Sequence, residues 1–112
     1  MRRGEIWWAS LRDQAGPGLR IRRPVVIVQS DEFTDSAIRT VLCVAVTSNL
    51  RLCDAPGNVR LPRRATGLAK ESIANVSQVI TTDKQFLTQR IGRLASTTLQ
   101  EIDAGLRLVL AL

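Results

Sequence analysis

Hydrophobic residues occur along the chain in short runs, separated by polar, Gly-containing and Pro-containing stretches. Residues 25–28 are all β-branched, and the longest uninterrupted apolar run, at 41–46, has six residues. Short aliphatic runs between turn signals are typical of buried strands. We therefore predict five or six short strands, at residues 4–11, 23–29, 41–47, 59–61, 72–81 and 91–94.

The predicted strand at 72–81 does not alternate regularly. Polar residues lie between Ile73, Val76 and Val79 at uneven spacing, so we expect an irregularity in this strand. Helical turns are expected at 31–36 and 83–87, and loops at 12–22, 49–58 and 62–67.

The last part of the chain is predicted to be an amphipathic helix that opens at residues 96–98. Thr97 with Gln100, and Thr98 with Glu101, have the spacing of a capping box. Gly105 lies in the middle of the helix, where glycine costs about 1 kcal/mol relative to alanine, so close packing is expected there. The apolar face consists of Leu99, Ile102, Leu106 and Val109.

These elements predict a single domain over residues 1–112, because the chain is too short for two separate cores. The fold class is mainly β with some α structure: a small, partly open β-barrel closed by the C-terminal helix. No apolar run is long enough to cross a bilayer, and residues 6–9 are too short for the core of a signal peptide. We expect a soluble, untargeted protein with no membrane partner.

The charge balance points to a polyanionic partner. Sixteen Lys and Arg residues against ten Asp and Glu give a net charge of +6. Most of the cations are arginine, whose planar guanidinium pairs with phosphate oxygens and stacks on bases. A basic surface that only keeps the protein in solution explains the same balance.

Missing residue types exclude several kinds of active site. The chain has no His, which rules out a two-histidine ribonuclease, a Ser-His-Asp triad and a His-ligated metal. Cys43 and Cys53 lack the spacing of a metal or redox motif, and Cys43 lies in an apolar run as a small buried hydrophobe would. Two such cysteines form no disulfide framework, which favours a reducing cytosol.

Short motifs follow one another in order over essentially the whole chain. They are Arg3-Gly4-Glu5-Ile6-Trp7, Arg23-Pro24-Val25-Val26-Ile27-Val28, Thr47-Ser48, Gly67-Leu68 before Ser72, Gln78-Val79-Ile80-Thr81-Thr82-Asp83-Lys84, and Ile91-Gly92. Each motif is weak by itself. The ordered set resembles the MazF/PemK family, the toxin half of type II toxin–antitoxin pairs.

The resemblance implies an SH3-like barrel of the CcdB/PemK type that forms a homodimer and cuts single-stranded RNA at specific short sequences in the cytoplasm, with no metal or other cofactor. It also implies a cognate acidic antitoxin. The family's two cleavage residues, the Arg of the Arg-Pro pair and the Thr after the third strand, correspond to Arg23 and Thr47, and its candidate RNA-contacting Gln to Gln78. The other candidate RNA-binding residues are Arg20, Arg22, Ser48, Asn49, Arg63 and Arg64.

Arg23 and Thr47 suit this chemistry for independent reasons. RNA cleaves when its 2′-hydroxyl attacks the adjacent phosphorus, and a protein assists by aligning the groups and stabilising the phosphoryl charge. An arginine at a strand start beside a proline is a rigid double donor for phosphoryl oxygens. A threonine hydroxyl can donate to the same phosphate or accept from the 2′-hydroxyl.

Each assignment has a structural alternative. Arg23 could lie along the surface or pair with Asp31 or Asp35, and Thr47 could be an ordinary strand-end residue. Of the adjacent residues Trp7 and Trp8, at most one is expected to be exposed for base stacking, because neighbouring strand residues face opposite ways. Arg63 and Arg64 could simply solvate a loop, and Ser72 and Gln78 could be satisfied polar residues.

One stretch departs from the family pattern. Many members carry Gly-Ser-Glu before the Arg-Pro pair, with the Glu as a candidate base, whereas this chain has Gly16-Pro17-Gly18. The acceptor of the 2′ proton is therefore open between water, a carboxylate such as Glu5, and an unusually placed arginine. Asn49 stands where Gln is common, so an altered sequence preference is expected.

Two other functions compete with RNA cleavage on the same fold. A CcdB-like gyrase inhibitor depends on an aromatic C-terminal end, but this chain ends Val109-Leu110-Ala111-Leu112 without a Trp. A non-catalytic relative that only binds RNA or an antitoxin is favoured by the missing loop Glu and opposed by the presence of Arg23 and Thr47.

Overall fold

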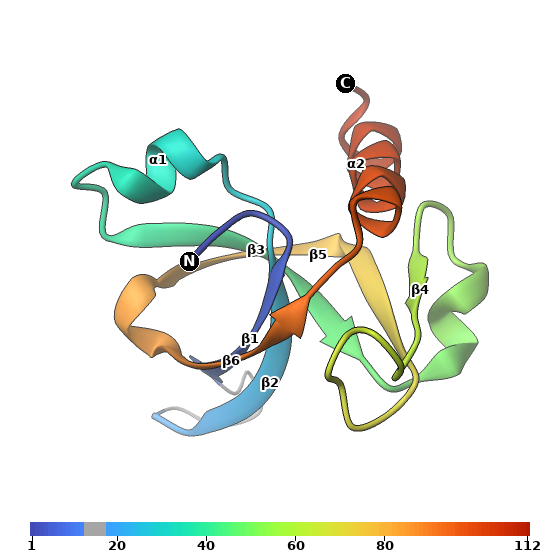
Figure 1. Cartoon of the computed structure of the whole chain (residues 1–112), viewed down its shortest axis with the longest axis horizontal. Helices are drawn as coiled ribbons and strands as arrows, with labels where there is room; N and C mark the ends of the chain where they lie inside the picture. The colour runs from blue at the N-terminus through green and yellow to red at the C-terminus, as the bar shows by residue number, and fades with distance from the viewer. Residues whose placement is uncertain (13–17) are drawn as a thin grey trace.

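A computed structural model describes residues 1–12 and 18–112 of the chain. Within them, six strands form one antiparallel sheet that curls into an open half-barrel, with one long helix at its side (Figure 1). The strand order is β4-β5-β3-β2-β1-β6, so β4 and β6 are the two free edges. The predicted fold class is confirmed. The elements are β1 (Glu5–Arg12), β2 (Arg20–Ile27), α1 (Asp31–Asp35), β3 (Thr40–Thr47), η1 (Leu50–Asp54), β4 (Val59–Leu61), β5 (Ser72–Asp83), η2 (Lys84–Phe86), β6 (Leu87–Arg93) and α2 (Ser96–Leu110).

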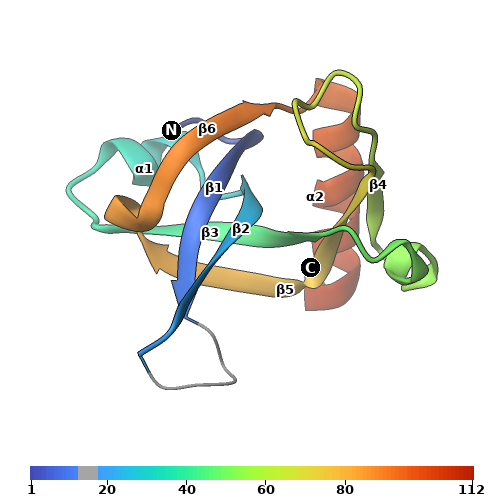
Figure 2. The ribbon, with the colours of Figure 1, turned by 90° about the horizontal axis from the view of Figure 1, so that it is seen from below.

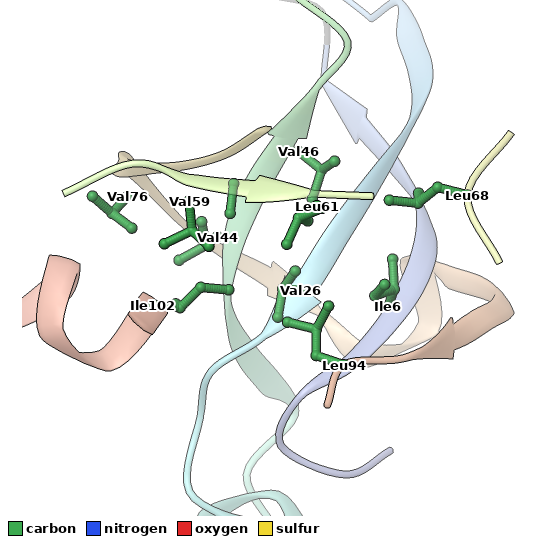
Figure 3. Packing of buried hydrophobic residues seen from close by; sticks show 11 residues of the cluster. Ile6, Val26, Val44, Val46, Val59, Leu61, Leu68, Val76, Leu94 and Ile102 are labelled. Atoms are coloured by element: carbon green, nitrogen blue, oxygen red, sulfur yellow. The ribbon is translucent and has the colours of Figure 1, made fainter. Parts of the chain in front are cut away.

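The second half of β2 and most of β3 are buried on both faces, which explains their apolar runs. Val26 and Val44 point into a cluster that also receives Ile102 from α2 (Figure 3). Their neighbours Val25 and Cys43 point into a second cluster on the other face of the sheet. Burial raises the pKa of the Cys43 thiol to about 12, so this cysteine is an inert core residue.

The helix α2 lies against β4 and β5 through a close backbone contact, as predicted for Gly105. A Cβ atom at Gly105 would lie 2.1 Å from the carbonyl oxygen of Gly57, in the turn before β4. Ile102 is fully buried on this face of the helix, but Val109 is 43% exposed. The apolar face of α2 is therefore only partly covered, because the last turns of the helix extend past the sheet (Figure 1).

The capping-box prediction was also wrong. The helix begins at Ser96, and its N-cap is Ala95, which makes no side-chain cap hydrogen bond. Thr97 and Thr98 therefore lie inside the first turn, where their hydroxyls cannot cap the free N–H groups.

Two strands begin earlier than predicted because strand pairing overrides local polarity. The strand β2 begins at Arg20, which pairs with Arg12 across the β1–β2 hairpin. The strand β6 begins at Leu87 and pairs along β1. The predicted loop at 49–58 contains η1, and the helical turns expected at 31–36 and 83–87 are α1 and η2. Among the described residues, no helix has the length and hydrophobicity of a bilayer crossing.

Candidate functional site

A groove of about 980 Å³ lies where the β1–β2 hairpin meets the β3–β5 side of the sheet. Figure 2 shows the ends of β1 and β2 projecting past β3 and β5. The polar and aromatic residues that line this groove are Arg12, Arg20, Arg23, Thr47, Ser77, Gln78, Thr81, Thr82, Asp83 and Phe86. The groove therefore contains four of the residues predicted from the sequence: Arg20, Arg23, Thr47 and Gln78.

The groove is open because β2 and β3 stop pairing before their ends. The last pair of their ladder is Val25 with Ala45. The residue before Val25 in β2 is Pro24, which has no backbone N–H to donate to a neighbouring strand. The first half of β2 therefore pairs only with β1 and leaves the end of β3 uncovered on that side.

Arg23 and Thr47 lie on opposite walls of this gap. Side chains alternate along a strand, so Arg23 is on the same face of the sheet as Val25, and Thr47 is on the same face as Ala45. The pairing of Val25 with Ala45, continued by two residues, would bring Arg23 directly opposite Thr47. Both residues line the groove, so the unpaired strand ends present a guanidinium and a hydroxyl toward the same space.

The hydroxyl of Thr47 is oriented by the turn that follows it. The backbone N–H of Asn49 donates to Thr47 Oγ1 at 3.1 Å. With one lone pair of the oxygen used in this way, the hydroxyl proton is free to donate into the groove. The side chain of Asn49 is itself used locally, because its Oδ1 accepts from the N–H of Arg51 and caps η1.

The predicted irregularity in β5 brings Gln78 to the groove. The pairing of β3 with β5 passes from Val44–Val79 to Ala45–Asn75, which leaves residues 76–78 of β5 without paired residues in β3. Within this bulge Val76 is fully buried, whereas Ser77 and Gln78 are exposed and line the groove. Asn75 Nδ2 donates to Gln78 Oε1 at 3.0 Å and orients its amide.

The far end of the groove holds Arg20 on an aromatic ring. Arg20 Cζ lies 3.6 Å from the centroid of Phe86, and its Nη1 donates to the carbonyl of Ser10 at 2.8 Å. Sequence reasoning identified Arg20 but missed Phe86 and Arg12. Phe86 follows the Asp-Lys turn in η2, and only the folded chain shows that this turn reaches the β1–β2 hairpin.

Five predicted RNA-binding residues do not line the groove. Arg22 stacks on Trp8, with Cζ 4.4 Å from the ring centroid, and its Nη2 donates to Gln89 Oε1 at 2.8 Å. Trp7 and Trp8 are both half-buried. The other four are Ser48 and Asn49, which are exposed beside Thr47, and Arg63 and Arg64, which line a separate hollow of about 560 Å³ with Lys70.

The alternative pairing of Arg23 with Asp31 or Asp35 was wrong. The side chain of Arg2 pairs with both carboxylates, and Asp31 also accepts from the backbone N–H of Arg3 at 2.8 Å. Within the described part of the chain, the guanidinium of Arg23 makes no ion pair or hydrogen bond. None of the described residues therefore occupies its donors.

Glu5 does not line the groove, so it is not placed to accept a proton there. Burial raises the pKa of its carboxyl. Hydrogen bonds from the Arg2 backbone N–H and the Trp7 indole, with the charge of Arg90, lower that pKa by more. The net effect is a lowered pKa, so the Glu5 carboxylate is harder to protonate and is a weak base.

Asp83 is the one carboxylate among the described residues that line the groove. It pairs with Thr40 at the opposite end of β3 from Thr47. The two positions are seven residue steps apart, which is about 23 Å along β3. Asp83 is therefore too far from Arg23 and Thr47 to exchange a proton with a group held between them. Gly16 and Pro17, where the loop Glu is missing, lie outside the described residues.

Comparisons with known proteins agree with this architecture. Residues 2–110 match the family described as PemK-like, MazF-like toxin of type II toxin-antitoxin system. Endoribonuclease MazF6 of Mycobacterium tuberculosis is 42% identical over 110 residues, which cover 98% of this chain and 96% of that protein. Endoribonuclease EndoA of Bacillus subtilis is 28% identical over 112 residues, with coverage of 100% and 96%.

The fold also matches solved structures. The structure of an endoribonuclease in complex with its cognate antitoxin, from a mycobacterial species, superposes with a TM-score of 0.80 at 21% identity and covers 100% of this chain and 96% of that chain. A family match over nearly the whole chain, with a relative at 42% identity, identifies this chain as a member of the PemK-like, MazF-like toxin family of type II toxin–antitoxin systems.

Proposed function

We propose that this chain is an endoribonuclease toxin that cuts single-stranded RNA at specific short sequences in the groove, without a metal ion. The observation that carries this function is the position of Arg23 and Thr47 on the two walls of the gap between β2 and β3. The relatives named endoribonucleases support the same activity. They favour it over a gyrase inhibitor or a non-catalytic binding module.

The proposed reaction uses the RNA's own nucleophile. The 2′-oxygen forms a bond to the adjacent phosphorus, and the bond from phosphorus to the 5′-oxygen breaks. The products are a 2′,3′-cyclic phosphate and a free 5′-hydroxyl. Arg23 stabilises the charge on the phosphoryl oxygens, and the Thr47 hydroxyl donates to the same phosphate. We assign the 2′ proton to water, because Glu5 does not line the groove and Asp83 lies far along it from Arg23 and Thr47.

This mechanism predicts full RNA cleavage in the presence of excess EDTA. Neither guanidinium nor hydroxyl donors require a metal, so chelation should leave the rate unchanged. The measurement is a gel assay of a defined RNA, with enzymatic analysis of the product ends for cyclic or 3′ phosphate and 5′-hydroxyl. A magnesium titration of the EDTA-treated protein is the control, and activity that disappears with EDTA and returns with magnesium would overturn the mechanism.

We propose that two copies of residues 1–112 form the active unit. The end of α2 leaves apolar side chains in water, with Leu108 63% and Leu110 54% exposed. Burying such residues against a second copy is favourable, and two-fold dimers are the commonest oligomers. Light scattering at micromolar concentration should give about twice the 12.4 kDa of one chain. A species with the mass of one chain at that concentration would contradict the dimer.

We further propose a cytoplasmic location and a cognate acidic antitoxin as the protein partner. A cationic groove that binds phosphates also suits an acidic, extended peptide that folds on binding. The solved structure of a similar endoribonuclease with its cognate antitoxin supports this partner.

If the antitoxin covers the groove, its inhibition should be competitive with RNA. Fluorescence anisotropy of a labelled RNA should fall to the free value as the cognate antitoxin, which we expect a neighbouring gene to encode, is added. Arg20→Ala should weaken the binding of both ligands. A ternary complex that holds RNA with unchanged affinity would show that the antitoxin acts from another surface.

A further inference from the structure

We infer that Arg20 and Phe86 form a stacking platform that holds one nucleobase of the RNA close to the cleaved phosphate. Phe86, through Arg20, then helps to set which base is accepted at that position. This inference rests on the proposed function, because it assigns a base-binding role within the same groove.

The guanidinium of Arg20 is held in place before any ligand binds. Its Cζ lies 3.6 Å from the centroid of the Phe86 ring, which is the separation of two stacked planar groups. One of its N–H groups donates to the carbonyl of Ser10 at 2.8 Å. Phe86 is half-buried, so its ring forms a fixed support, whereas Arg20 is exposed. A guanidinium fixed on one face by a ring presents its other face to the groove.

The platform lies at a useful distance from the proposed cleavage site. Arg20 and Arg23 are three residues apart on β2, so their side chains leave the strand on opposite faces, yet both line the groove. This separation is about 10 Å along the strand. A phosphate held by Arg23 therefore leaves a neighbouring nucleotide of an extended strand within reach of Arg20.

The chemistry of the pair favours a base over a phosphate. Bases of single-stranded RNA stack on aromatic rings and on arginine planes, and the flat face of a guanidinium has no directed N–H for a phosphate oxygen. A contact with a phosphate uses the charge of Arg20 and gains nothing from the ring beneath it. A stacked base uses the plane of the guanidinium, which the ring holds in place. The other arginine–aromatic pair, Arg22 on Trp8, does not line the groove.

The test compares Phe86→Leu with wild type on a short RNA whose cleavage position has been mapped. The RNA carries a 2′-deoxynucleotide at that position, so that it binds without being cut, and 2-aminopurine replaces one base at a time. In wild type, one position should show quenched fluorescence on binding. Phe86→Leu should lose that quenching and weaken binding about ten-fold. Phe86→Trp should restore both.

Two further variants separate stacking from charge and from folding. Arg20→Lys keeps the positive charge but removes the planar face, so it should also lose the quenching. Phe33→Leu makes the same substitution at an aromatic residue on α1 that is 60% exposed and outside the groove, and it should behave as wild type. Thermal unfolding of every variant checks the fold.

Base preference completes the test. Cleavage of RNAs that differ at the quenched position should become less selective in Phe86→Leu, measured as a ratio of kcat/KM values. Wild-type quenching and selectivity in Phe86→Leu, or in Arg20→Lys, would overturn the platform and leave Arg20 as a phosphate contact. Because binding is measured on uncut RNA, failure of the platform is distinct from failure of the proposed cleavage, which would show as no cutting by wild type.

Discussion

Replacing Arg23 by alanine is expected to slow RNA cleavage by about a hundred- to a thousand-fold while leaving the fold intact. The side chain loses charged donors to the phosphoryl oxygens, whose negative charge grows in the transition state, and such a loss costs roughly 3–4 kcal/mol. Within the described part of the chain the guanidinium supports no other side chain, so its removal should not alter stability. The measurement is single-turnover cleavage of a defined RNA, with thermal unfolding of the same preparation.

The matched control is Arg93→Ala. Arg93 is also exposed, and its loss changes the net charge equally, but it lies at the end of β6 and does not line the groove. We expect it to cut RNA at close to the wild-type rate. Thr47→Ala should fall between the two, because its hydroxyl contributes one neutral donor. Wild-type cleavage by a folded Arg23→Ala protein would show that the site assignment is wrong.

Gly105→Ala is expected to lower the free energy of unfolding by about 2–4 kcal/mol. The added Cβ would lie 2.1 Å from the carbonyl oxygen of Gly57 and 3.1 Å from the side chain of Val76. Both neighbours are fixed, one in a turn and the other in the core, so the helix itself must move away from β4 and β5. Chemical denaturation monitored by tryptophan fluorescence and by circular dichroism measures the loss.

The sign of this effect distinguishes packing from helix propensity. Alanine is the better helix former by about 1 kcal/mol, so a helix without the close contact would be stabilised by the same change. Gln100→Ala, at an exposed position of α2, should shift stability by less than about 0.5 kcal/mol. A Gly105→Ala protein as stable as wild type would contradict the close approach of α2 to the turn at Gly57.

Local patterns predicted most of the sheet because the second half of β2 and most of β3 are buried on both faces. The apolar runs of β2 and β3, and the irregularity of β5, are visible in the order of residues alone. The start of β2 at Arg20 was not predictable in this way, because its polar residues are held extended by pairing with β1. The same holds for the first residues of β6, which are polar and exposed. The start of each of these strands is set by its partner strand, which lies elsewhere in the sequence, so a local pattern does not show it.

The residues of the candidate site that belong to local sequence motifs could be predicted. Those that only the folded chain brings to the groove could not. Arg23, Thr47 and Gln78 belong to motifs, and the structure brings all three to one groove. Arg63 and Arg64 were proposed from charge alone, and they lie at a different hollow. Phe86 was missed because its partner Arg20 is 66 residues away in the sequence, so no local pattern relates the two.

The most direct test of the proposed mechanism removes a single oxygen atom from the substrate. An RNA whose cleavage position has been mapped is synthesised with a 2′-deoxynucleotide at the cleaved position only, and a second RNA carries the same change one nucleotide further along. In EDTA, the protein should cut the second RNA at the unmodified rate and leave the first intact, because the 2′-oxygen is the nucleophile. Cleavage of the first RNA at the same position and rate would contradict 2′-hydroxyl attack in the groove between Arg23 and Thr47.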